Sequence, residues 1–232
     1  MVTVGAQTFE RNAGGLVAPV PAHRLRDQLR LYLVTDQPCL QGRALVDVVL
    51  TAVQGGVTCV QLREKTLATR DFLALATTLM RHLAPLNIPL IINDRIDIAL
   101  ACGAQGVHLG QSDMPVEDAR RLLRPEVFIG WSVETPEDVA RAAKLPVDYL
   151  GVSPVFATPT KTDTLAPWGL GGLAAVRAAT SLPLVAIGGI NASNARDVLK
   201  AGADALAVVS AICAAPDPRQ AAIQLRKLTD AR

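Results

Sequence analysis

Short apolar runs alternate with amphipathic runs along most of this chain, and this rhythm constrains the fold more than any other feature. Eight β-branched or aliphatic runs fit buried strands, at about 31–35, 57–61, 90–92, 106–109, 128–131, 149–152, 184–187 and 205–209. Helical spacing follows them, at about 43–54, 69–83, 96–102, 115–123, from 136, 170–179, 193–201 and 218–228. Repeated strand–helix alternation predicts a parallel sheet, and eight units predict a closed α/β barrel, the (β/α)8 TIM barrel.

An open, doubly wound sheet is the structural alternative. It is less favoured because no G-x-G-x-x-G motif follows the first strand. The chain has 232 residues and is 50% hydrophobic, which is enough for one well-buried core. We therefore predict a single TIM-barrel domain over residues 25–232, with few insertions because the folded part falls short of the usual ~250 residues.

Residues 1–24 show no apolar periodicity, and Gly14-Gly15, Pro19 and Pro21 would break any regular element. We interpret them as a flexible N-terminal arm, or as extra sequence from a mistaken start codon. An organelle transit peptide is less favoured, since Glu10 is present and no amphipathic helix is visible.

Composition excludes several functional classes. A formal net charge of +2 and 3% aromatic residues give neither a field nor a stacking platform for nucleic acid. No apolar run approaches the ~20 residues of a membrane span, and the first residues lack the pattern of a secretory signal. The four cysteines are far apart and form no C-x-x-C pair, which is typical of apolar fillers in a reducing compartment. We expect a cytoplasmic protein with small-molecule ligands, and the sequence is compatible with a homo-oligomer.

The stretch Gln61-Leu62-Arg63-Glu64-Lys65 ends the second predicted strand in three charged residues. Strand alternation places Gln61 and Arg63 on one face and Val60 and Leu62 on the other. Taken alone, the charges fit the first solvated residues of a loop as well as a ligand site. Other strands end in the same way, however, and in a barrel these ends share the face that carries active sites. The polar residues at such positions are Arg63, Lys65, Asn93, Asp94, Asp113, Ser132, Thr158, Thr160, Lys161, Gly189 and Ser210.

Asp94 and Asp113 follow adjacent predicted strands, so their carboxylates can converge. Two oxygen ligands with room for water and phosphate oxygens suit Mg²⁺. Lys65 and Lys161 add point charges for an anion, and Arg63 adds a bidentate fork. Each aspartate could instead be a helix cap, but the set as a whole favours a metal-bound diphosphate.

A second anion site is indicated where the last two strands end, at Gly188-Gly189 and Val209-Ser210. Loops there often bind phosphate through backbone N–H groups, which glycine leaves accessible. The alternative is a tight turn that needs positive φ. His108, inside a predicted strand, fits a packed core residue better than a catalyst, and Trp131 and Trp168 fit packing or mouth positions.

The motifs quoted above, together with His108-Leu109-Gly110-Gln111-Ser112-Asp113-Met114-Pro115, Thr158-Pro159-Thr160-Lys161 and Gly188-Gly189-Ile190, closely resemble the thiamine-phosphate synthase family. The resemblance runs from about Leu31 to the C-terminus. It implies a TIM-barrel transferase of thiamine biosynthesis. Such an enzyme joins 4-amino-2-methyl-5-hydroxymethylpyrimidine diphosphate to hydroxyethyl-methylthiazole phosphate, or its carboxylated form, to give thiamine phosphate and diphosphate. From the carboxylated form, CO2 is also released. In the family the step is understood as dissociative, through a pyrimidine-stabilised carbocation.

The resemblance also implies roles for individual residues. The pyrimidine diphosphate would be held by Gln61, Leu62, Arg63, Glu64, Lys65, Asn93, Ser132 and Lys161. The thiazole phosphate would be held by Thr158, Pro159, Thr160, Gly189, Val209 and Ser210. Asp94 and Asp113 would bind Mg²⁺, and Lys161, Ser132 and Arg63 are the residues assigned to catalysis.

Two other functions share these features in part. The related thiazole tautomerase transfers protons on the same barrel but would not need both metal carboxylates and both lysines. A non-catalytic barrel that senses or carries thiamine phosphates would bind ligand without releasing diphosphate. The complete polar set favours the synthase over both.

Overall fold

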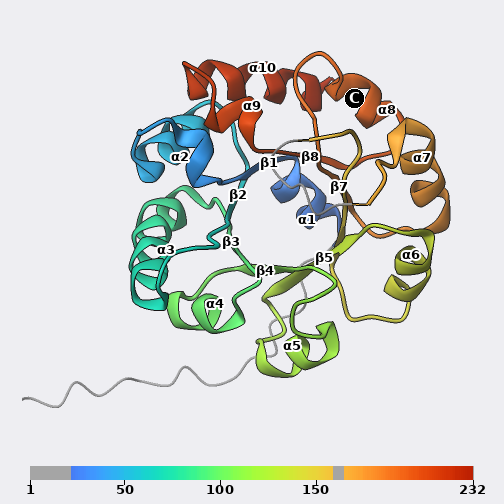
Figure 1. The fold of residues 1–232 in the computed structure, drawn as a ribbon, viewed down its shortest axis with the longest axis horizontal. Coiled ribbons are helices and arrows are strands. Elements are labelled where there is room, and N and C mark those ends of the chain that lie inside the picture. Colours follow the sequence, from blue (N-terminus) through green and yellow to red (C-terminus); the bar gives the residue numbers. More distant parts are fainter. Residues whose placement is uncertain (1–21, 159–164, 232) are drawn as a thin grey trace, which may run out of the picture.

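Eight parallel strands close into a barrel in the order β1 to β8 (Figure 1). The structure is a computed structural model that describes residues 22–158 and 165–231. The strands are β1 (Leu31–Val34), β2 (Cys59–Leu62), β3 (Leu90–Asn93), β4 (Gly106–Leu109), β5 (Phe128–Val133), β6 (Tyr149–Val152), β7 (Leu184–Ala186) and β8 (Ala205–Val208). The predicted TIM barrel is therefore confirmed, and the open sheet is excluded because β1 pairs with β8.

An outer ring of helices surrounds the barrel (Figure 1). Its members are α2 (Leu45–Gln54), α3 (Thr69–Leu83), α4 (Ile96–Cys102), α5 (Val116–Leu122), α6 (Pro136–Ala142), α7 (Gly169–Ala179), α8 (Ala195–Lys200) and α10 (Pro218–Asp230). Short turns of helix lie at η1 (Gln37–Leu40), η2 (Ala84–Leu86) and α9 (Ser210–Cys213). The predicted start of α6 is confirmed: the Thr135 hydroxyl accepts from the Asp138 N–H in a capping box, and Pro136 occupies the first turn.

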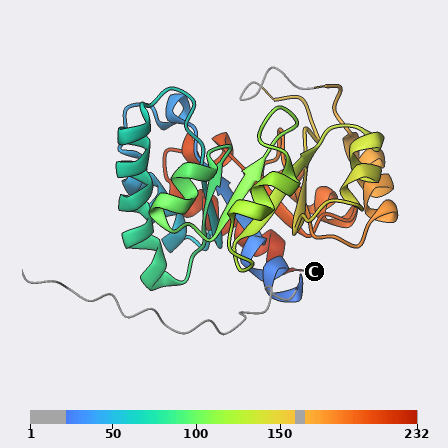
Figure 2. The same cartoon turned by 90° about the horizontal axis from the view of Figure 1, so that it is seen from below.

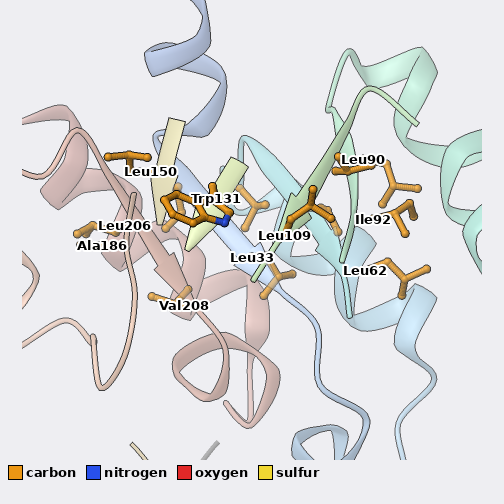
Figure 3. Close-up of a cluster of buried hydrophobic side chains, with 14 of the residues drawn as sticks. Leu33, Leu62, Leu90, Ile92, Leu109, Trp131, Leu150, Ala186, Leu206 and Val208 are labelled. Carbon is orange, nitrogen blue, oxygen red and sulfur yellow. The ribbon is translucent and has the colours of Figure 1, made fainter. Parts of the chain in front are cut away.

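Strand alternation sorts the side chains into two layers. Figure 3 shows the outward layer, in which residues such as Leu33, Leu62 and Leu109 are fully buried between the strands and the helices. The residues between them, such as Tyr32 and Gln61, point into the barrel. The predicted division of Val60 and Leu62 from Gln61 and Arg63 is therefore confirmed.

A helix that the sequence pattern did not predict closes the amino-terminal end of the barrel. Helix α1 (Ala22–Leu29) lies beneath the strands in Figure 2, and Leu25 and Leu29 pack on Tyr32 and other inward residues. Two buried leucines four residues apart are too weak a pattern to predict a helix of eight residues. The expected boundary after residue 24 falls inside α1, and residues 1–21 lie outside the described residues.

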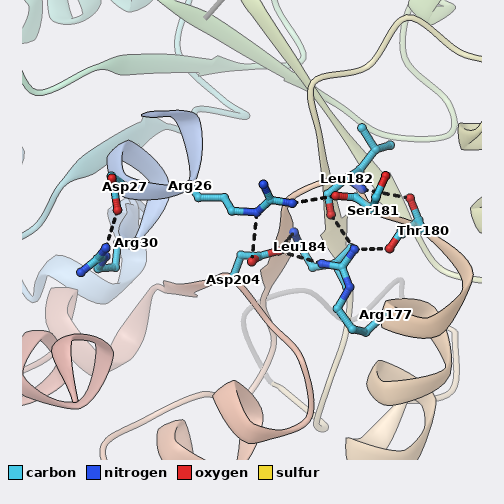
Figure 4. Close-up of polar contacts among 9 residues, drawn as sticks. All are labelled: Arg26, Asp27, Arg30, Arg177, Thr180, Ser181, Leu182, Leu184 and Asp204. Carbon is cyan, nitrogen blue, oxygen red and sulfur yellow. Dashed lines mark hydrogen bonds and ion pairs between the residues drawn. The ribbon is translucent and has the colours of Figure 1, made fainter. Parts of the chain in front are cut away.

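An ion-pair cluster fastens α1 to the barrel (Figure 4). Arg26 Nε lies 3.2 Å from Asp204 Oδ1, and Arg177 Nη1 of α7 lies 2.8 Å from Asp204 Oδ2. The same Asp204 oxygen accepts a 2.9 Å hydrogen bond from the Leu184 N–H at the start of β7. This half-buried carboxylate thus connects α1, α7 and the two last strands.

Two expectations from composition can be compared with the structure. Cys39, Cys59, Cys102 and Cys213 are all free thiols, as their spacing predicts. Among the helices of residues 22–158 and 165–231, none is both long enough and apolar enough to cross a membrane.

Candidate active site

A cavity of about 360 Å³ opens among the loops that follow the strands. Its walls come from the ends of strands far apart in the sequence, which the closed barrel brings together. Most of the predicted site residues line it: Gln61, Arg63, Lys65, Asn93, Asp94, Asp113, Ser132, Thr158, Gly189, Val209 and Ser210.

Two of the predicted site residues that the structure describes, Leu62 and Glu64, are not among those that line the cavity. Leu62 points outward into the apolar layer. Glu64 is 8% exposed, and its Oε1 has no hydrogen-bond partner within the described part of the chain. Burial raises the pKa of the Glu64 carboxyl. Pro159, Thr160 and Lys161 lie outside the described residues.

The two predicted metal ligands converge. Asp94 follows β3, and Asp113 lies in the loop after β4, where its Oδ2 accepts a 2.6 Å hydrogen bond from the Gly110 N–H. Burial raises the pKa of Asp113, and the nearby Asp94 carboxylate raises it further, against the lowering effect of the Gly110 hydrogen bond. The residue at the N-cap of α4 is Arg95 and that of α5 is Pro115, so neither aspartate is the cap that the alternative interpretation requires.

The donor set fits Mg²⁺. Within residues 22–158 and 165–231, no group of three or more His, Cys, Asp or Glu side chains is placed to hold a metal. Two carboxylates suit an ion that keeps several waters and shares phosphate oxygens with its substrate. Asp94 also has a φ of +63°, an uncommon conformation outside glycine that is often found at functional sites.

Two cationic side chains line the same cavity, and each is paired with an aspartate. Lys65 Nζ lies 2.5 Å from Asp94 Oδ2, and Arg63 Nη1 lies 3.0 Å from Asp36 Oδ1. The Arg63 N–H also donates to Thr35 Oγ1 at 3.1 Å. Thr35 and Asp36 line the cavity too, although the sequence reasoning did not select them. The sequence does mark Thr35 and Asp36 as candidate site residues, because they are polar and directly follow β1.

The loops after β7 and β8 form the other side of the cavity. Gly188 and Gly189 have φ values of +104° and +64°. A Cβ at Gly189 would lie 2.8 Å from the Ala157 carbonyl oxygen and 2.9 Å from Phe156 Cβ. Glycine is therefore required here both by backbone conformation and by the close approach of the loop after β6.

His108 and the tryptophans can also be placed. His108 lies inside the barrel on the cavity wall, and its Nε2 is 2.9 Å from Ser132 Oγ. It is thus held by polar contacts and faces the site, rather than being packed in an apolar core. Trp131 is buried in the outward layer under the Arg141 guanidinium, and Trp168 Nε1 donates to the Val133 carbonyl at 3.3 Å. Both tryptophans are packing residues, as predicted.

Fold and cavity define the class of this protein: it is a (β/α)8 barrel with a polar cavity among the loops after the strands, the face where barrels of this kind carry their active sites. Residues 31–212 match the family described as "Thiamine monophosphate synthase". A thiamine-phosphate synthase from Albidiferax ferrireducens is 76% identical over 211 residues, which cover 90% of this chain and 96% of the relative. The chain therefore belongs to the thiamine monophosphate synthase family.

Further comparisons agree. A thiamine-phosphate synthase from Leptospira biflexa is 52% identical over 200 residues, which cover 84% of this chain and 95% of the relative. The solved structure of a thiamine phosphate pyrophosphorylase from Pyrococcus furiosus is 40% identical, with a TM-score of 0.82 and coverage of 89% of this chain and 98% of that one. A 3-hexulose-6-phosphate synthase, 20% identical with a TM-score of 0.62, shares the fold, with 86% of this chain and 99% of that one covered.

Proposed function

We propose that this cavity joins 4-amino-2-methyl-5-hydroxymethylpyrimidine diphosphate to hydroxyethyl-methylthiazole phosphate, or its carboxylated form, with Mg²⁺ held by Asp94 and Asp113. Membership of the family gives the chain thiamine-phosphate synthase activity in thiamine biosynthesis. The observation that carries the detailed assignment is the convergence of two carboxylates and two cationic side chains at the ends of β2, β3 and β4.

This reaction requires stabilisation of negative charge on the leaving group more than it requires proton transfer. The bond from the pyrimidine methylene carbon to the diphosphate oxygen breaks, and the thiazole nitrogen supplies the electron pair for the new C–N bond. The carboxylated thiazole also loses its carboxylate as CO2. Asp94 and Asp113 would hold Mg²⁺, which when bound would supply positive charge beside the leaving diphosphate. Lys65 and Arg63 add positive charge at the same oxygens, and Lys161 is assigned there from the resemblance. No general base is needed.

The two substrates are assigned to opposite walls. The pyrimidine diphosphate is assigned to Gln61, Arg63, Lys65, Asn93 and Ser132, which lie on β2, β3 and β5 or in the loop after β2. The thiazole phosphate is placed against Thr158, Gly189, Val209 and Ser210, near the ends of β6 to β8. This arrangement presents the nucleophile to the methylene carbon, and positioning of that kind contributes much of a two-substrate rate enhancement. Leu62, Glu64, Pro159 and Thr160 remain predicted contacts, which backbone groups could supply.

The test is a coupled assay of diphosphate release with both substrates, before and after removal of divalent metal. We expect release to require both substrates and to return when Mg²⁺ is restored. Release without metal would contradict the role of the two aspartates. Binding of both substrates with no release would instead favour the carrier function, and proton exchange on the thiazole without release would favour the tautomerase.

Lys161 gives a second test of the map. Lys161→Ala should lower kcat by about 100-fold while changing the KM for thiazole phosphate little, because its charge matters most as diphosphate departs. Lys144→Ala serves as a control, because Lys144 follows α6 and is not among the residues that line the cavity. A Lys161→Ala enzyme with normal kcat and only a raised thiazole KM would place Lys161 at the other substrate.

A further inference from the structure

Five inward side chains form one continuous hydrogen-bond chain across the inside of the barrel. Gln61 Nε2 donates to Tyr32 OH at 2.8 Å, and Tyr32 OH lies 3.0 Å from Tyr149 OH. Tyr149 OH lies 2.9 Å from His108 Nδ1, and His108 Nε2 lies 2.9 Å from Ser132 Oγ. Gln61, Tyr32, His108 and Ser132 all line the cavity, and the two ends, Gln61 and Ser132, are assigned above to the pyrimidine substrate.

The barrel is built to accommodate this chain. A Cβ at Gly130 would lie 2.0 Å from Tyr149 Cζ, and a Cβ at Gly151 would lie 2.8 Å from His108 Cε1. Neither glycine has a positive φ. Glycine is therefore needed at these two positions because it has no side chain, and not because of its backbone conformation. TIM-barrel interiors are commonly filled by branched apolar residues. In this barrel, β5 and β6 have glycine at the positions where the rings of Tyr149 and His108 need space.

The chain transmits hydrogen-bond direction from one end to the other. Tyr32 is 1% exposed and Tyr149 is fully buried, and burial raises the pKa of both phenols well above the ordinary value, so each keeps its single proton. When Gln61 Nε2 donates to Tyr32 and every hydroxyl proton is used within the chain, Tyr32 donates to Tyr149, and Tyr149 donates to His108 Nδ1. The proton of the neutral imidazole is then on Nε2 and is donated to Ser132 Oγ.

This direction fixes what each end offers to a ligand. The Gln61 Oε1 atom is left as an acceptor, and the Ser132 hydroxyl proton is left as a donor. Reversing one link alone would leave a buried hydroxyl proton without an acceptor in the chain, which is costly, so the two ends are expected to change together. An aminopyrimidine carries an amino donor and ring-nitrogen acceptors, and therefore needs one acceptor and one donor from the protein.

We propose that Tyr32, Tyr149 and His108 are positioning residues that set the hydrogen-bonding direction of Gln61 and Ser132 toward the aminopyrimidine ring. They act through these two residues and do not themselves have to contact substrate. The proposal rests on the proposed function, because it takes the pyrimidine to lie against Gln61 and Ser132.

The first experiment cuts the chain in the middle. Tyr149→Phe keeps the ring and removes only the linking hydroxyl. We expect the KM for the pyrimidine diphosphate to rise about three- to tenfold, the effect of one buried hydrogen bond, with the thiazole phosphate KM unchanged. Tyr32→Phe, which breaks the neighbouring link, should do the same. Cys59→Ala is the matched control, since Cys59 packs in the same inward cluster but is no member of the chain.

Coupling separates positioning from a structural role. In a Gln61→Ala/Ser132→Ala background, Tyr149→Phe should raise the pyrimidine KM no further, because both ends through which it acts are gone. A further rise there, or equal rises in both KM values accompanied by a lower melting temperature, would overturn the proposal. If Gln61→Ala and Ser132→Ala leave the pyrimidine KM unchanged, the proposed substrate map fails and the proposal fails with it. If Gln61→Ala and Ser132→Ala raise the pyrimidine KM but Tyr149→Phe does not, the substrate map stands and only the positioning role of the chain is overturned.

The direction itself can be read without substrate. The chain has three histidines, so the ¹⁵N imidazole signals of His108 can be assigned by their loss in His108→Asn. We expect the proton of the wild-type ring on Nε2, with Nδ1 unprotonated, and a mixture of tautomers in Tyr149→Phe. A His108 ring protonated on Nδ1 in the wild type, or signals unchanged in Tyr149→Phe, would overturn the proposal.

Discussion

Lys65 Nζ lies 2.5 Å from Asp94 Oδ2, so a cation assigned to the diphosphate and a carboxylate assigned to the metal are paired with each other. They come from the ends of neighbouring strands, β2 and β3. The Lys65 side chain is 53% exposed, and such ion pairs contribute at most about 1 kcal/mol to stability. Exchanging this pair for contacts with a metal-bound diphosphate therefore costs little.

Asp94→Asn should separate the metal role from the ion pair. We expect kcat/KM to fall by about 100-fold or more and the Mg²⁺ concentration for half-maximal rate to rise, because a ligand charge is lost. The free energy of unfolding should change by less than about 1 kcal/mol. Rates of diphosphate release over a Mg²⁺ titration give the first result, and urea denaturation gives the second. Asp97→Asn, exposed in the next turn and paired with Arg95, is the control, and an equal loss in both variants would contradict the assignment.

Asp113→Asn should stabilise the protein while it inactivates the enzyme. Burial raises the pKa of Asp113 above its ordinary value of 3.8. Folding therefore favours the protonated carboxyl, and this contribution is present below the unfolded pKa and lost as pH rises through the folded one. Asparagine has no charge to bury, so the variant should gain up to about 1 kcal/mol near pH 7. Urea denaturation between pH 4 and pH 8 should show the gain growing with pH and then levelling. A gain that shrinks as pH rises would show the sign to be wrong.

Gly189→Val tests the thiazole phosphate wall. The added side chain meets the loop at 156–157 and a φ of +64°, so we expect the thiazole phosphate KM to rise about tenfold or more. The pyrimidine diphosphate KM should change little. Circular dichroism and thermal melting check that the barrel remains folded. Gly171→Ala in α7, where an added Cβ meets nothing within 4 Å, should leave both KM values as they are. Equal rises in both KM values for Gly189→Val would mean that the two substrates are not separated as proposed.

Two N-terminal truncations distinguish the predicted arm from the helix beside it. Removing residues 1–21 should leave turnover and melting temperature nearly unchanged, because that sequence has no pattern able to bury apolar area. Removing residues 1–29 deletes Leu25 and Leu29, whose burial stabilises the fold by about 1.5–3 kcal/mol each. Thermal melting of both proteins beside the full chain should show a large loss only for the longer truncation. A large loss of turnover or melting temperature on removal of residues 1–21 would contradict the prediction that these residues form an arm.

The parts of this structure that follow a regular period were predictable. Gln61 and Arg63 were assigned to the inner face from alternation alone, and the cavity lining agrees. The chain through Tyr32, His108 and Tyr149 was not foreseen, because it depends on which strands face each other across the barrel. A pattern of inward Tyr, His and Gln opposite inward glycines would have been the signal. Helix α1 was missed for a different reason, since its burial depends on the barrel above it.

The pairing of β1 with β8, which closes the barrel, determines when the active site can form. Leu31 of β1 pairs with Leu206 of β8, and Arg30 Nη1 beside α1 bonds Asp230 Oδ1 at the end of α10, 3.1 Å away. β1 pairs with β2 as well as with β8, and β8 comes after every other described strand of the barrel, so the leucines of α1 have a complete barrel to cover only once β8 has paired with β1. Thr35 at the end of β1 and Val209 after β8 face the same cavity. The walls that carry Thr35 and Val209 therefore meet only when the first strand pairs with the last, and such non-local contacts are the kind that slow folding.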